Sequence, residues 1–159
     1  MSIQRTYKSV YLLCALMLMG ALSNSPAKAQ DDLLEWITFE EALKIGEKVE
    51  KPILVDVWAP WCGWCKKMQK EVYPKHSAVL SDDFVLTRLN RDDNESKKTF
   101  QGYSLTPLRL TQRLNVQTVP AVVFLSPEGE YLFHITGFTE SEKLGEILEQ
   151  VFPSIWEAS

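Results

Sequence analysis

Two cysteines separated by two residues, Cys62 and Cys65, constrain this chain more than any other feature of its sequence. They follow an apolar run at residues 53–58, which predicts a buried strand. They open a stretch at residues 62–71 in which the pattern predicts a helix. Because residues three apart are neighbours on one helical turn, both sulfurs are expected to meet at the helix start. A strand followed by such a pair favours redox chemistry over a structural role.

The two sulfurs are expected to differ in exposure and reactivity. Cys62 lies where unpaired backbone N–H groups and the helix dipole favour a thiolate over a thiol. Cys65 lies one turn inside the helix and is expected to be less exposed. This asymmetry suits an exchange in which Cys62 attacks a substrate disulfide and Cys65 then resolves the mixed disulfide. Gly63 permits close approach of a substrate, and Trp61 and Trp64 offer an apolar contact surface.

A zinc site and an inert structural disulfide are the alternatives to a redox pair. Structural zinc needs four ligands, and after residue 29 the chain adds only His76 and His134, far apart and without ligand spacing. A disulfide between residues three apart closes too small a loop to restrain the unfolded chain much. The sequence therefore favours a redox pair, and we expect no metal and no cofactor.

The N-terminal segment has the order of a secretory signal peptide. Arg5 and Lys8 give a basic start, and residues 10–22 form an apolar run of 13 residues, too short to span a bilayer. A small-x-small triplet ends at Ala29, so cleavage is expected after that residue. Cys14 lies in the apolar run and would be discarded. An uncleaved membrane anchor is the alternative.

The remaining residues, 30–159, are expected to form one domain. Removal of residues 1–29 takes away three basic residues and no acidic one, so the formal net charge changes from −4 to −7. A chain this acidic, without a basic stripe, is a poor candidate for binding nucleic acid or an anionic membrane. No window of 18 apolar residues exists, so no transmembrane helix is expected. We expect a monomer that is soluble in the periplasm or another exported compartment.

The pattern along the chain alternates strands and helices, which predicts an α/β fold with a central mixed sheet flanked by helices. Capping boxes at Thr38 and Thr139 open two helices, and Pro74 should kink or end the helix that starts at Cys62. Residues 90–105 are polar and predicted to be irregular. Tyr131 is expected to share one face of a hairpin strand with Phe133 and Ile135. The predicted helices cover residues 38–49, 62–71, 76–80, 106–114 and 139–152, and the predicted strands cover residues 36–37, 53–58, 84–89, 121–125 and 130–136.

Several matches beyond the cysteines resemble the thioredoxin superfamily. The run at residues 53–59, followed by Trp61, Cys62 and Gly63, is close to the core strand and active site of that family. The Val119–Pro120 pair resembles its cis-proline loop, and Gly137 matches the glycine before its final helix. The resemblance covers residues 33–153 and implies a thioredoxin fold and thiol–disulfide exchange.

Within the superfamily the chain is similar to exported bacterial thioredoxin-like proteins of the SoxW kind, and to reductant-side domains that feed periplasmic thiol pathways. The similarity rests on residues 100–102, 115–116, 118–120 and 126–129. The chain departs from thioredoxin in two respects. Trp64 replaces the usual active-site proline, and the segment at residues 91–108 is longer than its thioredoxin counterpart.

The resemblance assigns expected roles to three further residues. Asp56 lies in an otherwise apolar strand, and the family implies a buried acid beneath Cys65, with a raised pKa, that accepts the Cys65 proton. The alternative is a strand-end carboxylate that faces solvent. Arg88, where thioredoxin has lysine, could pair with Asp56 or be solvated. A cis bond before Pro120 would place the backbone of Val119 beside Cys62, where an extended substrate segment could pair with it.

These observations predict a thiol–disulfide oxidoreductase that acts on protein substrates. A reductase recharged by a membrane electron donor is the first interpretation, because the strand and the proline loop resemble thioredoxin more than the strong oxidants. A disulfide-forming oxidase is the second interpretation. A third is a non-catalytic binding module that uses Trp61, Trp64 and the 91–108 segment, although the presence of both cysteines argues against it.

Overall fold

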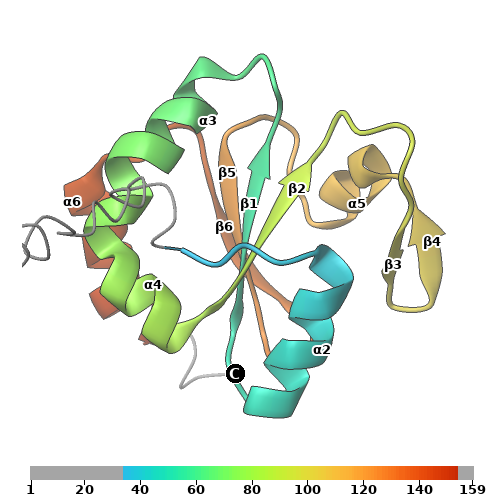
Figure 1. Ribbon diagram of the computed structural model, residues 1–159, viewed down its shortest axis with the longest axis horizontal. Helices are drawn as coiled ribbons and strands as arrows, with labels where there is room; N and C mark the ends of the chain where they lie inside the picture. Colours follow the sequence, from blue (N-terminus) through green and yellow to red (C-terminus); the bar gives the residue numbers. More distant parts are fainter. Residues whose placement is uncertain (1–33, 154–159) are drawn as a thin grey trace, which may run out of the picture.

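The structure is a computed structural model that describes residues 34–153, so the predicted signal peptide lies outside the described residues. A four-stranded sheet with the order β2-β1-β5-β6 forms the centre (Figure 1). Strands β1 (Ile53–Trp58) and β2 (Val85–Asn90) are parallel. Strands β5 (Ala121–Leu125) and β6 (Tyr131–Thr136) continue the sheet in antiparallel pairings. The predicted mixed sheet is confirmed.

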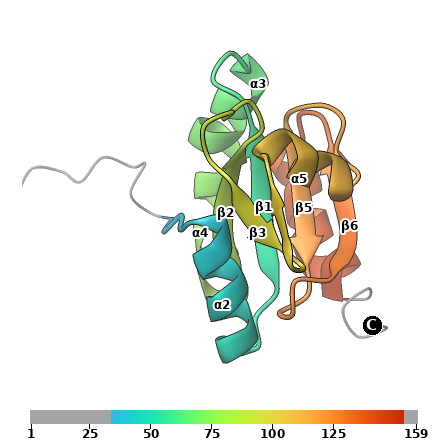
Figure 2. The ribbon, with the colours of Figure 1, turned by 90° about the vertical axis from the view of Figure 1, so that its right-hand side faces the viewer.

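Helices cover both faces of the sheet, as Figures 1 and 2 show. One face packs against α3 (Gly63–Lys67), α4 (Ser77–Asp83) and α6 (Ser141–Glu146), and the other against α2 (Phe39–Val49) and α5 (Pro107–Arg113). Within the described residues no helix is long and apolar enough to cross a membrane.

Alternation along β1 decides which layer each of its side chains joins. Leu54 packs into the core on the α3 side, whereas Val55 and Val57 pack into the core on the α2 side. Asp56 has the same parity as Leu54 and therefore faces the helices that follow Cys62. The fold thus places the one acidic residue of this strand under the helical run that begins at the dithiol.

That helical run changes geometry instead of ending at Pro74. After α3 come a π-helical turn (Met68–Val72), a 3₁₀ turn (Tyr73–His76) and then α4. Pro74 lies at the start of the 3₁₀ turn, where its missing N–H costs least. The expected break is therefore a change of helix type.

The two predicted capping boxes have different outcomes. At the start of α2, the Thr38 hydroxyl accepts from the Glu41 N–H and the Glu41 carboxylate accepts from the Thr38 N–H, so that box is confirmed. At the start of α6 the prediction is wrong, because the N-cap is Glu140 without a side-chain bond. The Thr139 hydroxyl instead donates to the Gly137 carbonyl oxygen at 3.5 Å.

The prediction of an irregular segment at residues 90–105 is wrong over its second half. A small hairpin forms from β3 (Lys98–Phe100) and β4 (Tyr103–Leu105), and Gln101 and Gly102 take positive φ angles at its turn. The hairpin is anchored by Phe100, which is buried against Phe39 with ring centroids 5.7 Å apart. One buried ring in a polar segment therefore holds this hairpin.

Strand β6 departs from simple alternation because of a register shift. Phe124 pairs with Phe133, whereas Leu125 pairs with Tyr131, so the strand has one extra residue at this point. Leu132 therefore packs against the core with Phe133, while Tyr131 is exposed. The expectation that Tyr131 shares a face with Phe133 and Ile135 is wrong for this reason.

Candidate active site

Cys62 and Cys65 form a disulfide at the start of α3, with their Cα atoms 5.3 Å apart. Cys62 is the N-cap residue, and its Sγ accepts the Cys65 N–H at 3.0 Å. Because such a bond favours the charged form of sulfur, this geometry stabilises a thiolate on Cys62 after reduction. Cys62 is 4% exposed and Cys65 is 0% exposed, which is the order of exposure predicted from the spacing.

Two exposed indoles flank the disulfide. Trp61 is 68% exposed and Trp64 is 57% exposed. Trp64 packs on Phe138 with ring centroids 4.9 Å apart, and the Lys67 ammonium lies over both rings. At Gly63 an added Cβ would meet no heavy atom within 4 Å, so the space beside it is open. The predicted contact surface is thus present, and its role in substrate binding stays a prediction.

The loop before β5 completes the surroundings of the disulfide. The Val119–Pro120 peptide bond is cis, as the sequence predicts. Val119 packs against the small cluster formed by Ala59 and the two cysteines. The structure therefore brings Val119 together with the dithiol, although it lies more than fifty positions away in the sequence.

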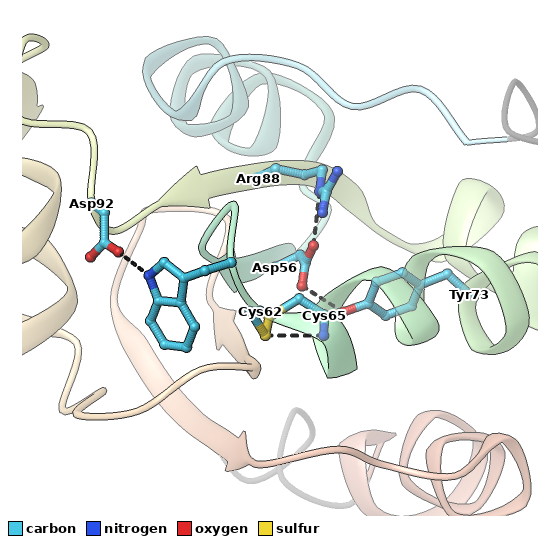
Figure 3. The surroundings of a disulfide bond; sticks show 7 residues. Asp56, Cys62, Cys65, Tyr73, Arg88 and Asp92 are labelled. Atoms are coloured by element: carbon cyan, nitrogen blue, oxygen red, sulfur yellow. Dashed lines mark hydrogen bonds and ion pairs between the residues drawn. A yellow bond between two sulfur atoms is a disulfide. The ribbon is translucent and has the colours of Figure 1, made fainter.

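Asp56 is fully buried, and each of its carboxylate oxygens accepts one hydrogen bond (Figure 3). The Tyr73 hydroxyl donates to Oδ1 at 2.8 Å. The Arg88 Nε–H donates to Oδ2 at 2.8 Å and also forms an ion pair with it. The alternative of a solvent-facing Asp56 is wrong, and so is that of a solvated Arg88. Their pairing follows from the parallel register, which sets Asp56 beside Arg88.

Burial raises the pKa of Asp56 above its ordinary value, because the charged carboxylate loses its hydration. The Arg88 charge and the two hydrogen bonds oppose this effect without cancelling it. Burial likewise raises the pKa of Tyr73 well above its ordinary value, and the neighbouring carboxylate raises it further. At neutral pH Tyr73 is therefore a neutral phenol that donates to Asp56.

Aromatic rings enclose the Arg88 guanidinium. It lies 4.7 Å from the Trp58 ring centroid and 5.6 Å from that of Trp36. Trp36 also packs on Tyr73, with ring centroids 5.5 Å apart. Stacking of this kind favours a planar cation that stays charged, which arginine supplies more reliably than lysine.

A further hydrogen bond fixes the indole of Trp61. Its Nε1–H donates to the Asp92 carboxylate at 2.6 Å, the bond marked by the dashed line at Asp92 in Figure 3. The Asp92 backbone N–H donates in turn to the side-chain oxygen of Asn90, which is the last residue of β2. The loop after β2 therefore positions one wall of the dithiol site.

Three of these residues were not predicted from the sequence as parts of the site, namely Trp36, Tyr73 and Asp92. A signal existed for one of them. A buried carboxylate needs donors, and Tyr73 lies two residues beyond the predicted helix 62–71, just before Pro74. No sequence signal pointed to Trp36 or Asp92. Among residues 34–153, no group of three or more His, Cys, Asp or Glu side chains is arranged to hold a metal ion.

The disulfide lies at the start of α3, close to the cis-proline loop and to a buried acid. This arrangement on a thioredoxin-type sheet defines a class of thiol–disulfide oxidoreductases. The family model for the thioredoxin-like domain matches residues 39–152, and the chain belongs to this family. The predicted fold and the predicted enzyme class are thereby confirmed. Members of this class act on protein thiols and disulfides.

The chain is similar to several characterised proteins. Thioredoxin from Alicyclobacillus acidocaldarius subsp. acidocaldarius is 26% identical over 102 residues, which are 64% of this chain and 83% of that protein. The thiol:disulfide interchange protein DsbD of Escherichia coli (strain K12) is 28% identical over 96 residues, 58% of this chain but 15% of DsbD.

Solved structures show the same fold. A Thermus thermophilus thioredoxin superposes with a TM-score of 0.59 and 24% identity, covering 75% of this chain and 87% of that one. The DsbH oxidoreductase superposes with a TM-score of 0.54 and 23% identity, covering 79% and 86%. At these identities the likeness concerns the fold alone.

Proposed function

We propose that this protein reduces disulfides in protein substrates outside the cytoplasm, after removal of residues 1–29. Cys62 is the attacking thiolate and Cys65 resolves the mixed disulfide. Asp56 takes the proton of Cys65. Trp61, Gly63, Trp64, Val119 and Pro120 contact the substrate. The resemblance to exported proteins of the SoxW kind supports the location, and a membrane electron donor would restore the dithiol.

The reaction passes two electrons from the dithiol to the substrate. The Cys62 thiolate attacks one substrate sulfur, a mixed disulfide forms, and the other substrate sulfur leaves as a thiolate that takes a proton from water. Cys65 then loses its proton to the Asp56 carboxylate and attacks the Cys62 sulfur. The Cys62–Cys65 disulfide forms, and the second substrate sulfur leaves as a thiolate.

The observation that carries the reducing direction is the similarity to thioredoxins, which extends over 83% of one such protein. The match to a protein named for thiol:disulfide interchange supports exchange between proteins, but it covers only 15% of that protein. The whole activity of DsbD is therefore not assigned to this chain.

The reduction potential of the Cys62–Cys65 pair tests the direction. Purified protein is equilibrated with glutathione or dithiothreitol buffers, and the fraction of disulfide is measured by alkylation and mass. A value near about −270 mV, typical of thioredoxin, supports the reductase, whereas one near about −120 mV, typical of DsbA, would make the protein an oxidase.

A further inference from the structure

The Asp56 carboxylate has a more complete set of partners than a proton acceptor in an apolar pocket requires. Both of its oxygens accept a hydrogen bond of 2.8 Å, one from a phenol and one from a guanidinium. Within residues 34–153, Arg88 and Tyr73 are the charged or titratable side chains that bond to it. On the β5 side its neighbour is Val122, which is apolar.

The two donors come from different elements, and the fold aligns each of them. Arg88 lies beside Asp56 in the parallel register of β1 and β2. Tyr73 lies in the same helical run as Cys65, after the π-helical turn Met68–Val72. A π turn adds one residue, which rotates the following side chains by about 100° relative to a regular α-helix. The π turn therefore sets the direction in which Tyr73 points from this run.

Trp36 packs against both donors to Asp56, Tyr73 and Arg88. Its ring packs on the Tyr73 ring at 5.5 Å and on the Arg88 guanidinium at 5.6 Å. It lies just before Ile37, which is joined to β2 by a bridge to Thr87. The donors are thus fixed by packing as well as by hydrogen bonds, and a carboxylate between two fixed donors has a fixed orientation.

We propose that Tyr73 is a positioning residue that, together with the Arg88 cation already expected to pair with Asp56, keeps the Asp56 carboxylate ionised and oriented to take the proton of Cys65 during resolution. This inference rests on the proposed function, in which Asp56 is the proton acceptor. Each donor bonds to the charged form, so the loss of either makes the protonated acid more favourable. A protonated Asp56 cannot accept the Cys65 proton. Resolution should then require a higher pH.

The test follows resolution as a function of pH in the protein recovered after removal of residues 1–29. Reduced protein is mixed with excess of a disulfide-containing model protein, quenched with acid, and the mixed disulfide is quantified on non-reducing gels between about pH 5 and 9. In Tyr73→Phe the acid limb of the rate profile should move to higher pH. At the pH where the wild type has half its limiting rate, resolution should be about fivefold slower.

Tyr131→Phe is the matched control, because it also removes a hydroxyl that makes a hydrogen bond, to His134 Nδ1 at 2.7 Å, on a strand away from the dithiol. Its profile should overlay that of the wild type. Arg88→Gln removes the other donor together with its charge, and should move the acid limb in the same direction and further. If Tyr73→Phe folds poorly, Tyr73→Leu removes the same donor and takes its place.

An unchanged acid limb in the Tyr73 variant would overturn the inference, since a merely structural residue alters stability without moving a pH midpoint. Asp56→Asn separates this failure from failure of the proposed function. If Asp56→Asn keeps the wild-type acid limb, Asp56 is not the proton acceptor and both proposals fall. If Asp56→Asn abolishes the limb while Tyr73→Phe leaves it in place, only the positioning role falls.

Discussion

At the scale of single residues, the buried carboxylate of Asp56 controls how the stability of the oxidised protein depends on pH. Burial raises its pKa in the folded state. A raised pKa means that the folded protein holds this proton more tightly than the unfolded chain does. The resulting stability is fully present below the unfolded pKa of about 3.9 and is lost as the pH rises through the folded value.

We therefore predict that the free energy of unfolding of the wild type falls, relative to that of Asp56→Asn, as the pH is raised from about 4 to 8. The amide keeps the size of the side chain and cannot ionise, so the difference isolates Asp56 from carboxylates such as Asp93, whose pKa is lowered. Urea unfolding of both oxidised proteins at several pH values measures this difference in the free energy of unfolding. A difference that is constant or grows with pH would show that the folded pKa is not raised.

The unequal exposure of the two sulfurs predicts different trapping behaviour. Cys62 is 4% exposed and caps the helix, whereas Cys65 is 0% exposed. Cys65→Ser should accumulate mixed disulfides with protein substrates, because the attacking sulfur remains and the resolving one is absent. Cys62→Ser should form far fewer. Non-reducing gels followed by mass mapping of the adduct check this, and the reverse pattern would exchange the two roles.

The sequence predicted the chemistry of these residues better than their partners. The burial of Asp56 was implied by the family resemblance, with a solvent-facing carboxylate as the alternative, and the roles of the cysteines followed from their spacing. The donors to Asp56 lie 17 and 32 residues away. Their contacts depend on strand register and on a π turn, neither of which leaves a local pattern in the sequence. For this reason the sequence left open whether Arg88 pairs with Asp56 or is solvated, and it did not reveal the contact with Tyr73.

At the scale of elements, the loop after β2 positions Trp61 beside the dithiol through Asp92. Removal of this acceptor should leave the indole exposed but free to move. We predict that Asp92→Ala raises KM for a protein disulfide by about two- to tenfold, the range that corresponds to one hydrogen bond. Reduction of a small disulfide, which needs no extended contact surface, should be unchanged.

Asp92→Asn serves as the control for this prediction, because its amide oxygen can still accept the indole N–H. It should restore most of the affinity for the protein substrate. Equal KM values for the wild type and Asp92→Ala would mean that Trp61 contributes no oriented contact. A parallel loss with the small disulfide would place the effect at the cysteines instead.

The caps of the two surface helices predict different sensitivities. Thr38 caps α2 with its hydroxyl, whereas the N-cap of α6, Glu140, makes no side-chain bond. Thr38→Ala should lower the free energy of unfolding by about 1 kcal/mol, the usual value for an N-cap. Glu140→Ala should change it by less than about 0.5 kcal/mol. Denaturant unfolding at one pH compares the two variants, and equal losses would contradict the assignment of the caps.

Elements with strong local signals were predicted within a few residues, among them α2, β1 and β5. The β3–β4 hairpin was missed because its strands have three residues each and are mostly polar, so no alternation was visible. The capping box at Thr139 failed for a different reason. Its spacing was correct, but the helix begins two residues later, at Ser141, and the hydroxyl turns back toward Gly137.

At the scale of the whole molecule, the topology unites pieces that are distant in sequence around one redox pair. The dithiol follows β1, the acid's cationic partner comes from β2, and the cis-proline loop precedes β5. Because β1 is central in the sheet, with β2 and β5 on either side, these three regions must converge near its end. The sequence could predict this convergence only through the family resemblance, since composition and periodicity do not specify strand order.

The location of the molecule gives the last prediction. The basic residues Arg5 and Lys8, the apolar run at residues 10–22 and the triplet ending at Ala29 predict export with cleavage before Gln30. The chain produced with its first 29 residues in a bacterial host should be recovered from the exported fraction with Gln30 at its N-terminus. Intact mass and N-terminal sequencing measure this. Ala29→Lys should block cleavage, because the processing site requires a small residue there. Recovery of wild-type protein that keeps Met1 in the membrane pellet would instead support the uncleaved anchor, and would place the dithiol at a membrane surface.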